Sequence, residues 1–263
     1  MHKLTQAQEK EIRSLLTRHG RKKSDKLMIE GMRSISALLD RGLRPERVVV
    51  SPDDLSEPGR AFVDALSRKG VPLTECSRKS MAEFSETVHS QGVIAVINRS
   101  ALQADESAWR RVKLAVYLDA VADPGNVGTI IRTCAAFGVS LIILSPGSAD
   151  IANPKVLRSS AGTIFALPIA VDIGAETLAS YMKSNNIELV GTAADATMNI
   201  GAYSPKSKTC IALGAEATGL SEAILSLCAV KVKIPGADNV ESLNVASAAA
   251  IAIYQLSQRM KLL

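Results

Sequence analysis

Continuous apolar runs, separated by helical segments, dominate the second part of the chain. Five of these runs are rich in aliphatic and β-branched residues: LAVYLDAV (114–121), SLIILS (140–145), ELVGTAA (188–194), TCIALG (209–214) and VKVKIP (230–235). Such strands, alternating with helices, predict a parallel sheet covered on both faces. Ligands bind these sheets at the carboxyl ends of the strands. We therefore expect the functional loops directly after four positions: Ala120, Ala193, Leu213 and Ile234.

The first part of the chain predicts a smaller α/β domain. Its β-branched runs and apolar periodicity indicate three strands and two helices: strands at 27–31, 47–51 and 93–97, and helices through residues 35–39 and at 60–69. From Asn98 to Arg111 the chain loses this periodicity and becomes polar, which is typical of a linker.

The net charge of +5 is confined to the first part of the chain. Residues 1–112 carry 20 Lys/Arg and 15 Asp/Glu, whereas residues 113–263 carry 11 of each. A dense basic cluster lies near the N-terminus: Arg18, Arg21, Lys22, Lys23 and Lys26. It fits either a solvated face with a disordered tail or a phosphate-binding arm, because Lys and Arg near phosphates release counterions. Charge alone leaves both interpretations open.

Composition narrows the function classes. Aromatic residues make up only 3% of the chain, which argues against an RNA reader that stacks several bases on aromatic rings. The four cysteines (Cys76, Cys134, Cys210 and Cys228) are far apart and only three histidines exist, so we expect reduced thiols and no metal. There is no apolar stretch of transmembrane length and no signal-peptide core at the N-terminus, which favours a cytoplasmic protein.

The first of the expected functional loops is Asp123-Pro124-Gly125-Asn126. Pro and Gly suit a tight turn, and Asn126 is well suited to cap the apolar helix that follows. Arg132 is the lone charge in that helix. Such an arginine is either ion-paired at the surface or held next to the strand ends as a site residue.

The second and third loops carry glycines and polar side chains. LGAEATGLS (213–221) lacks the Gly-Lys-Ser/Thr of a P-loop and the glycine spacing of a dinucleotide fingerprint. Its Glu216 repels phosphate and favours a cationic or hydroxyl-bearing ligand. In the third loop, Ser242 or Asn244 is placed to cap an Ala-rich helix.

Together these segments resemble a known family. DPGNVGTIIRTCAAFGV, LGAEATGLS and IPGADNVESLNVASAAAIAIY are similar, in order and separation, to motifs 1, 2 and 3 of the SpoU/TrmH class of RNA ribose 2′-O-methyltransferases. NPKVLRSSAG (153–162) resembles the stretch between motifs 1 and 2. Upstream, LMIEGMRSISALL and GVIAVI resemble the family's N-terminal substrate-binding domain, which is similar to ribosomal protein L30e. The resemblance covers about residues 24–258.

The resemblance implies an α/β protein whose C-terminal parallel-sheet domain is tied in a trefoil knot, an exception to the rule against threaded chains. Together with the patterns above, it leads us to divide the chain into four parts: a basic extension (1–23), an L30e-like RNA-binding domain (24–98), a linker (99–112) and a SpoU methyltransferase domain (113–263). The resemblance also implies S-adenosylmethionine as cofactor and a homodimer formed through the knotted domain.

The resemblance also assigns roles to residues. It places Arg132 at the attacking ribose oxygen, with four polar residues around it: Asn126, Glu216, Ser242 and Asn244. Seven residues are expected to hold the cofactor: Thr192, Leu213, Gly214, Gly219, Ile234, Leu243 and Asn244. The candidates for RNA contacts are Arg21, Lys22, Lys23, Arg33 and Arg158. The chain departs from the usual family residues at three positions: Ala215, Ala217 and Gly236.

Methyl transfer is an in-line displacement, for which positioning supplies several kcal/mol, up to roughly 7–11 in ideally oriented reactions. Because a guanidinium holds its proton firmly, we interpret Arg132 as a cationic clamp on phosphate and developing oxyanion rather than as a base. An L30e-like domain favours 23S rRNA over tRNA. A tRNA 2′-O-methyltransferase and a non-catalytic ribosome-assembly protein of the same fold remain alternatives, although the latter is expected to lose Arg132, Glu216 or Asn244. A dinucleotide-dependent oxidoreductase lacks its fingerprint here.

Overall fold

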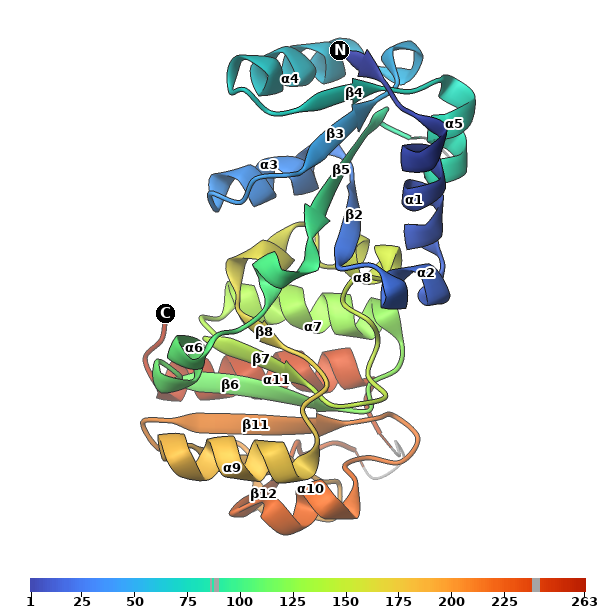
Figure 1. Cartoon of the computed structure of the whole chain (residues 1–263). Coiled ribbons are helices and arrows are strands. Elements are labelled where there is room, and N and C mark those ends of the chain that lie inside the picture. Colours follow the sequence, from blue (N-terminus) through green and yellow to red (C-terminus); the bar gives the residue numbers. More distant parts are fainter. Residues whose placement is uncertain (86, 88–89, 238–241) are drawn as a thin grey trace. The chain divides into compact units, whose positions relative to one another are not determined.

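The computed structural model describes residues 1–85, 87, 90–237 and 242–263. By its internal contacts the chain forms two compact units (Figure 1). Unit 1 comprises residues 1–101 and 151–165, and unit 2 comprises residues 102–150 and 166–263. Each unit has its own sheet and its own hydrophobic core.

Unit 1 is built on a five-stranded mixed sheet with the order β1-β4-β3-β5-β2. The strands are β1 (His2–Lys3), β2 (Lys26–Glu30), β3 (Arg47–Val50), β4 (Leu73–Glu75) and β5 (Val93–Asn98). β5 runs antiparallel to β2 and β3, whereas β3, β4 and β1 are parallel. The three strands predicted for this part of the chain are confirmed.

The helices of unit 1 cover this sheet. They are α1 (Gln6–Leu16), α2 (Arg18–Lys23), α3 (Met32–Asp40), α4 (Glu57–Arg68), α5 (Arg78–Phe84) and α8 (Pro154–Ser159). The short 3-10 helices η1 (Pro52–Asp54), η2 (Arg99–Leu102) and η3 (Thr163–Ala166) lie between them or at the unit boundaries. The predicted helices at 35–39 and 60–69 correspond to α3 and α4.

The first 23 residues fold as an integral part of unit 1. α1 begins at a capping box formed by Thr5 and Gln8, which satisfies two backbone donors at its start. Its Ile12 and Leu15 are almost fully buried and pack in a core cluster with Phe84. Residues 1–23, which we expected to form a basic extension, therefore contribute side chains to the core of unit 1.

α8 also packs in unit 1, against β2, although it is distant in sequence. Gly162, just after this helix, has φ +83°, and a Cβ there would lie 2.9 Å from the Cβ of Ala37. The glycine therefore permits both the turn and the close approach to α3.

Unit 2 contains a seven-stranded sheet that is parallel throughout, in the order β10-β12-β9-β11-β6-β7-β8. Its strands are β6 (Leu114–Asp119), β7 (Leu141–Leu144), β8 (Ile169–Ala170), β9 (Glu188–Thr192), β10 (Met198–Asn199), β11 (Thr209–Gly214) and β12 (Val230–Lys233). All five predicted strands are present, and the predicted parallel α/β class is confirmed. The two-residue strands β8 and β10 lie at the edges, too short to leave a periodic signal.

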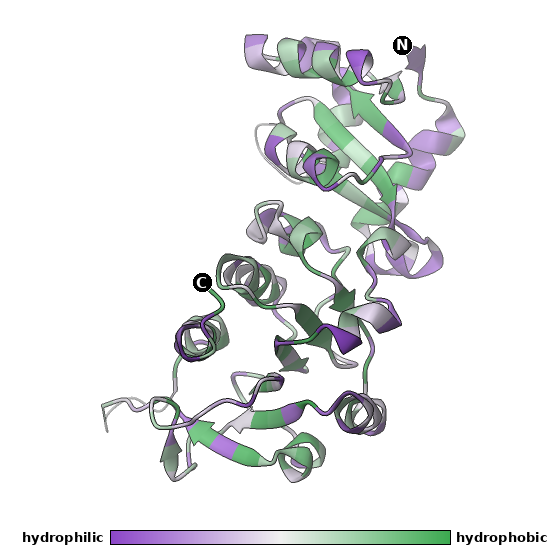
Figure 2. Ribbon diagram, turned by 90° about the vertical axis from the view of Figure 1, so that its left-hand side faces the viewer, coloured by the Kyte–Doolittle hydropathy of each residue, from purple (hydrophilic) through white to green (hydrophobic). Residues whose placement is uncertain are grey.

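The helices of unit 2 are α6 (Glu106–Arg110), α7 (Pro124–Ala136), α9 (Ala175–Asn185), α10 (Glu222–Leu227) and α11 (Val245–Arg259). Figure 2 shows that the central strands are largely hydrophobic whereas the helices carry many hydrophilic residues. This distribution is what a sheet covered on both faces requires.

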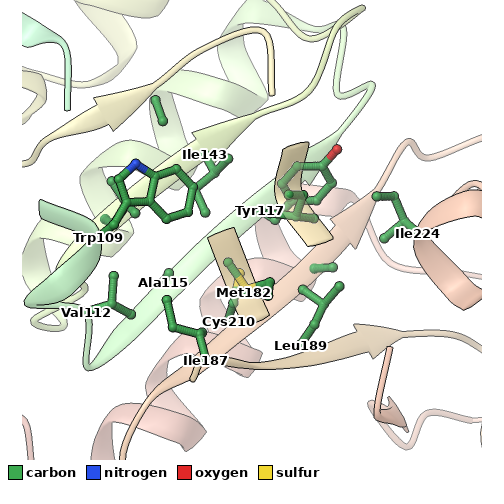
Figure 3. Close-up of a cluster of buried hydrophobic side chains, with 14 of the residues drawn as sticks. Trp109, Val112, Ala115, Tyr117, Ile143, Met182, Ile187, Leu189, Cys210 and Ile224 are labelled. Carbon is green, nitrogen blue, oxygen red and sulfur yellow. The ribbon is translucent and has the colours of Figure 1, made fainter. Parts of the chain in front are cut away.

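One core cluster of unit 2 begins in the segment expected to be a linker. Trp109 of α6 is buried and stacks on Tyr181 of α9, with ring centroids 4.1 Å apart. Tyr117, Met182 and Leu189 belong to the same buried cluster as Trp109 (Figure 3). The polar composition of residues 98–111 therefore conceals a short helix, capped by the Asp105 side chain, that anchors a large aromatic residue.

The four cysteines carry free thiols, and three of them are buried. Burial raises the pKa of the Cys228 thiol to about 11 and that of Cys76 to about 12. Among the described residues no His, Cys, Asp and Glu cluster is arranged to hold a metal ion, and no helix is long and apolar enough to cross a membrane.

Candidate active site

The strand ends of unit 2 bring the three sequence motifs to one edge of the sheet. β11 lies between β6 and β9, and β12 follows β9. Because all of these strands are parallel, the loops after them emerge at the same edge. The loops expected after Ala120, Ala193, Leu213 and Ile234 therefore begin at this edge. The third motif continues into α11, which packs against α7. Residues 238–241 of that motif lie outside the described residues.

The first motif begins α7. Asp123, not Asn126, is its N-cap: Asp123 Oδ1 accepts a hydrogen bond of 2.9 Å from the Asn126 backbone N–H. The sequence-based assignment of Asn126 as the cap is therefore wrong by three positions, because Pro124 occupies the first helical turn, where its missing N–H costs nothing. The correction leaves the Asn126 side chain available for the site.

Asn126, Glu216 and Asn244, one from each motif, form a polar cluster that we call the motif cluster. Asn126 Nδ2 donates to Glu216 Oε1 at 2.9 Å, and Asn244 Nδ2 donates both to Glu216 Oε1 and to Asn126 Oδ1, the latter at 3.1 Å. Glu216 Oε1 also accepts from the Val245 backbone N–H at 3.3 Å. Hydrogen bonds to a charged acceptor are the stronger class, so this carboxylate ties the three motifs together.

Asn244 has a second role at the start of α11. Its Oδ1 accepts from the backbone N–H groups of Ala246 and Ser247, at 2.9 and 3.3 Å. The predicted cap of this helix is therefore Asn244 and not Ser242. One amide side chain thus caps the helix through its oxygen and binds Glu216 through its nitrogen.

Glu216 presents only one of its oxygens to this cluster. In the part of the chain that the structure describes, Glu216 Oε2 has no hydrogen-bond partner, and the side chain is exposed. A free carboxylate oxygen beside two amides is suited to accept a hydrogen bond from a hydroxyl.

The loop of the second motif folds back on itself. Gly219 has φ +67° and donates its backbone N–H to Ala215 O at 2.8 Å. A Cβ on Gly214 would lie 2.0 Å from the carbonyl carbon of Gly219, so only glycine allows this approach. The predicted Gly214 and Gly219 therefore shape the loop through their lack of a side chain.

Asp119 holds the far end of the same loop. This carboxylate ends β6, is 8% exposed, and accepts a hydrogen bond of 2.8 Å from the Ser221 backbone N–H. Sequence reasoning did not single out Asp119, although a carboxylate at the end of an otherwise apolar buried strand was a signal for it. Its burial and its bond indicate that it positions the motif 2 loop.

Four of the seven residues expected to hold the cofactor lie at or just beyond neighbouring strand ends. Thr192 ends β9, which lies between β11 and β12. Leu213 and Gly214 end β11, and Ile234 directly follows β12. Thr192 Oγ1 donates to Ala212 O at 3.0 Å, which fixes its side chain. The Leu213 side chain is buried, so this residue offers its backbone, whereas Leu243 is 44% exposed.

Two predicted catalytic residues, Arg132 and Ser242, make no hydrogen bond to the motif cluster among the described residues. Arg132 is exposed on α7 and makes no hydrogen bond or ion pair to the described residues. At 100° per residue, its position is rotated about 120° around the helix from Asn126. Ser242 is exposed and likewise has no hydrogen bond among the described residues.

The predicted RNA contacts differ in exposure. Lys22 and Lys23 at the end of α2 and Arg33 on α3 are exposed, and Arg158 is partly buried on α8. Arg21 is only 5% exposed, and its Nη1 donates to the Leu15 and Leu16 carbonyls at 3.1 and 2.8 Å. The guanidinium satisfies the last carbonyls of α1, and the role of Arg21 as an RNA contact stays a prediction.

Comparison with known proteins decides the family. The model of the SpoU rRNA methylase family matches residues 113–254, and that of the MRM3-like substrate binding domain matches residues 7–95. The chain belongs to the SpoU rRNA methylase family. The second match also includes α1, in agreement with its place in the core of unit 1.

Relatives within this family span nearly the whole chain. An uncharacterized tRNA/rRNA methyltransferase of Synechocystis is 32% identical, with 94% of this chain and 89% of the relative covered. The 23S rRNA (guanosine(2553)-2′-O)-methyltransferase RlmP of Bacillus subtilis is 31% identical, with 94% of each covered. The crystal structure of the SpoU methyltransferase AviRb from Streptomyces viridochromogenes, in complex with AdoMet, superposes with a TM-score of 0.85 at 26% identity, covering 97% of this chain and 98% of that one.

Proposed function

We propose that this protein transfers a methyl group from S-adenosylmethionine to a ribose 2′-hydroxyl of 23S rRNA. The observation that carries the proposal is the motif cluster, in which Asn126, Glu216 and Asn244 meet at the carboxyl edge of the sheet. Several relatives that cover most of the chain bear names of 23S rRNA 2′-O-methyltransferases. A non-catalytic relative would not need to keep all three motifs joined through one carboxylate.

The strand ends of β9, β11 and β12 fit S-adenosylmethionine. Gly214 and Gly219 place no side chain between the motif 2 backbone and a bound cofactor. The carboxylates of Asp119 and Glu216 at this edge suit a cationic ligand. When bound, this cofactor supplies an electrophilic methyl group on a positively charged sulfur. The residues that would hold it are Thr192, Leu213, Gly214, Gly219, Ile234, Leu243 and Asn244. Its presence in the AviRb structure supports the assignment.

The side chains of the site organise the nucleophile. Glu216 Oε2 is placed to accept a hydrogen bond from a ribose hydroxyl, and Asn126 and Asn244 orient this carboxylate. Arg132 has no partner among the described residues, which leaves its guanidinium available for an RNA phosphate and for negative charge that develops on the attacking oxygen. Ser242 is proposed as a further polar contact to the ribose.

Unit 1 is proposed to bind the RNA substrate. Its match to a substrate binding domain and its exposed Lys22, Lys23 and Arg33 support this role. Arg158 is retained as a candidate, since α8 belongs to the same unit. The domain match favours rRNA over tRNA, and we propose that the protein acts in the cytoplasm, where this substrate is made.

We also propose that the protein is a homodimer through unit 2, whose chain forms the trefoil knot of the family. α11 exposes a stripe at helical spacing that includes Ile251 and Tyr254, 43% and 49% exposed. Tyr254 packs edge-on against Phe137 at the end of α7, with centroids 5.4 Å apart. Exposed apolar residues gathered on two packed helices mark an association surface. Tyr254→Glu should convert a dimer to a monomer in sedimentation, and a wild-type monomer would contradict this proposal.

The function is tested by incubating the protein with S-adenosylmethionine labelled in its methyl group and with unmodified 23S rRNA or bulk tRNA. The expected result is label in 23S rRNA at one nucleotide that resists alkaline cleavage, because a methylated 2′-oxygen no longer attacks the adjacent phosphate. Label in tRNA alone would favour the tRNA alternative. Absence of label from both RNAs, with the cofactor bound, would favour the non-catalytic one.

A further inference from the structure

A group of basic residues lies at the edge of unit 2 where the strands begin, opposite the candidate active site. We call it the amino-edge patch: Arg110, Arg111, Lys113, Lys183, Lys206 and Lys208. Hydrogen bonds show that its segments are adjacent. Lys208 Nζ donates to Arg110 O at 3.0 Å and to Asn185 O at 3.3 Å, and the Thr209 backbone N–H donates to Lys113 O at 2.8 Å.

Few carboxylates neutralise this patch. Among the described residues, Glu106 pairs with Arg110 at 3.5 Å and Glu188 pairs with Lys206 at 2.8 Å. Asp105, which caps α6, is the third carboxylate near it. Arg111 donates to the Ser107 hydroxyl, and Lys113 and Lys183 are exposed without an ion pair to the described residues. Six cations therefore stand against three carboxylates.

This excess is local, because unit 2 as a whole holds 11 Lys/Arg and 13 Asp/Glu. Acidic residues instead follow the carboxyl ends of the strands: Asp119, Asp123, Asp150, Asp172, Asp195 and Glu216. The unit is thus polarised, with a negative edge at the candidate active site and a positive edge at the opposite end. A negative edge suits a cationic cofactor, and an RNA backbone that reaches Arg132 there gains from further cations elsewhere on the unit.

We propose that the amino-edge patch binds the phosphate backbone of the rRNA substrate at a second place, away from the target ribose. Neighbouring strands lie about 4.8 Å apart, so cations on adjacent strand ends lie within one Debye length, roughly 8–10 Å, and attract a polyanion together. The proposal rests on the proposed function for the identity of the RNA.

A groove beside the patch adds apolar surface to its charge. Its volume is about 380 Å³, and its lining includes Lys183 and Asn186, the ion pair of Lys206 with Glu188, and the apolar Met182 and Leu227. Leu227 is 36% exposed. Cations next to an apolar floor suit an unpaired nucleotide, whose base covers the floor while its phosphate meets the lysines.

The geometry sets the size of RNA that can use this patch. β6 runs from the patch to the motif edge over six residues, about 20 Å at roughly 3.3 Å per residue. No single nucleotide reaches both edges, whereas a folded rRNA does. The patch therefore contributes to binding of long RNA and not to binding of cofactor.

The test compares two triple variants with the same change in charge. The patch variant is Arg111→Gln, Lys113→Gln and Lys183→Gln. The control variant is Lys69→Gln, Lys79→Gln and Lys231→Gln, at exposed positions without an ion pair to the described residues. Binding of transcribed 23S rRNA is measured from about 50 to about 200 mM salt, where each phosphate contact contributes about 0.7–0.9 to the slope of log K against log salt. Cofactor binding and thermal unfolding show that both variants are folded.

The patch variant is expected to lower the salt slope by about 2 and the affinity at low salt by at least about tenfold, with cofactor binding unchanged. The control variant should retain the wild-type slope. A patch variant with the slope of the control would overturn the proposal, as would an unchanged slope in the single variant Lys183→Glu. This binding result is independent of the proposed function. If the wild-type protein transfers no methyl group to RNA, the proposed function is refuted, whatever the salt dependence of RNA binding.

Discussion

Asn244 donates its side-chain N–H to Glu216, 28 residues earlier in the chain, while its own oxygen caps α11. The third motif is therefore held to the second by the same side chain that starts the last helix. Loss of either partner should disturb the geometry of the motif cluster and so the reaction.

Glu216→Gln should lower the rate of methyl transfer by about ten- to a hundredfold, because an amide is a weaker acceptor than a carboxylate for the ribose hydroxyl and for both asparagines. The side chain is exposed, so the thermal unfolding temperature should hardly change. Glu222→Gln, an exposed carboxylate in the first turn of α10, is the matched control. Equal turnover of the two variants would remove Glu216 from the reaction.

Arg132→Ala should retain cofactor binding and lose methyl transfer, since this exposed guanidinium makes no contact with the described residues that folding depends on. Arg132→Lys should recover part of the activity, because a lysine keeps the charge but not the bidentate geometry. Calorimetry with S-adenosylmethionine measures cofactor binding, and a single-turnover assay with rRNA measures methyl transfer. Near-normal turnover of the alanine variant would show that Arg132 is not the clamp.

Asp119→Ala should weaken cofactor binding by releasing the motif 2 loop at Ser221. The change leaves a partly buried N–H without its acceptor, at a cost of about 1–3 kcal/mol in the free energy of unfolding. Asp119→Asn keeps an acceptor for the Ser221 N–H, so its KM for the cofactor should stay close to that of the wild-type protein. If the Asn variant is as impaired as the Ala variant, the hydrogen bond to Ser221 is not what Asp119 provides.

Gly214→Ala should abolish cofactor binding, because its Cβ would meet the Gly219 backbone at about 2.0 Å and force the loop apart. Gly201→Ala is the matched control, since no atom lies within 4 Å of a Cβ there. Tight cofactor binding by the Gly214 variant would show that the loop tolerates another shape.

The sequence predicted β6, β7, β9 and β11 well because each is an apolar run that is almost entirely buried. β12 is only partly buried, and its β-branched residues alternate with lysines. The family resemblance grouped Asn126, Glu216 and Asn244, and in the structure their motifs follow β6, β11 and β12 of one parallel sheet. Short or edge elements such as β8 and β10 left no such pattern.

Elsewhere the sequence was misleading for identifiable reasons. A basic cluster suggests a solvated arm, yet Arg21 is buried because it satisfies helix carbonyls that composition does not reveal. The polar stretch before β6 hid Trp109, whose stacking on Tyr181 is a long-range contact. Asn126 was predicted to cap α7 because asparagine and aspartate are both common N-cap residues. The helix begins at Pro124, so Asp123, whose backbone is extended, is the cap.

The most direct test of the account is the nucleotide-resolved map of 2′-O-methylation in 23S rRNA treated with wild-type protein, with Glu216→Gln or with Arg132→Ala. The account predicts one new ribose methylation with the wild-type protein, and its loss or strong reduction with both variants while each still binds S-adenosylmethionine. Methylation on a base, or a ribose mark of equal intensity with all three proteins, would contradict it.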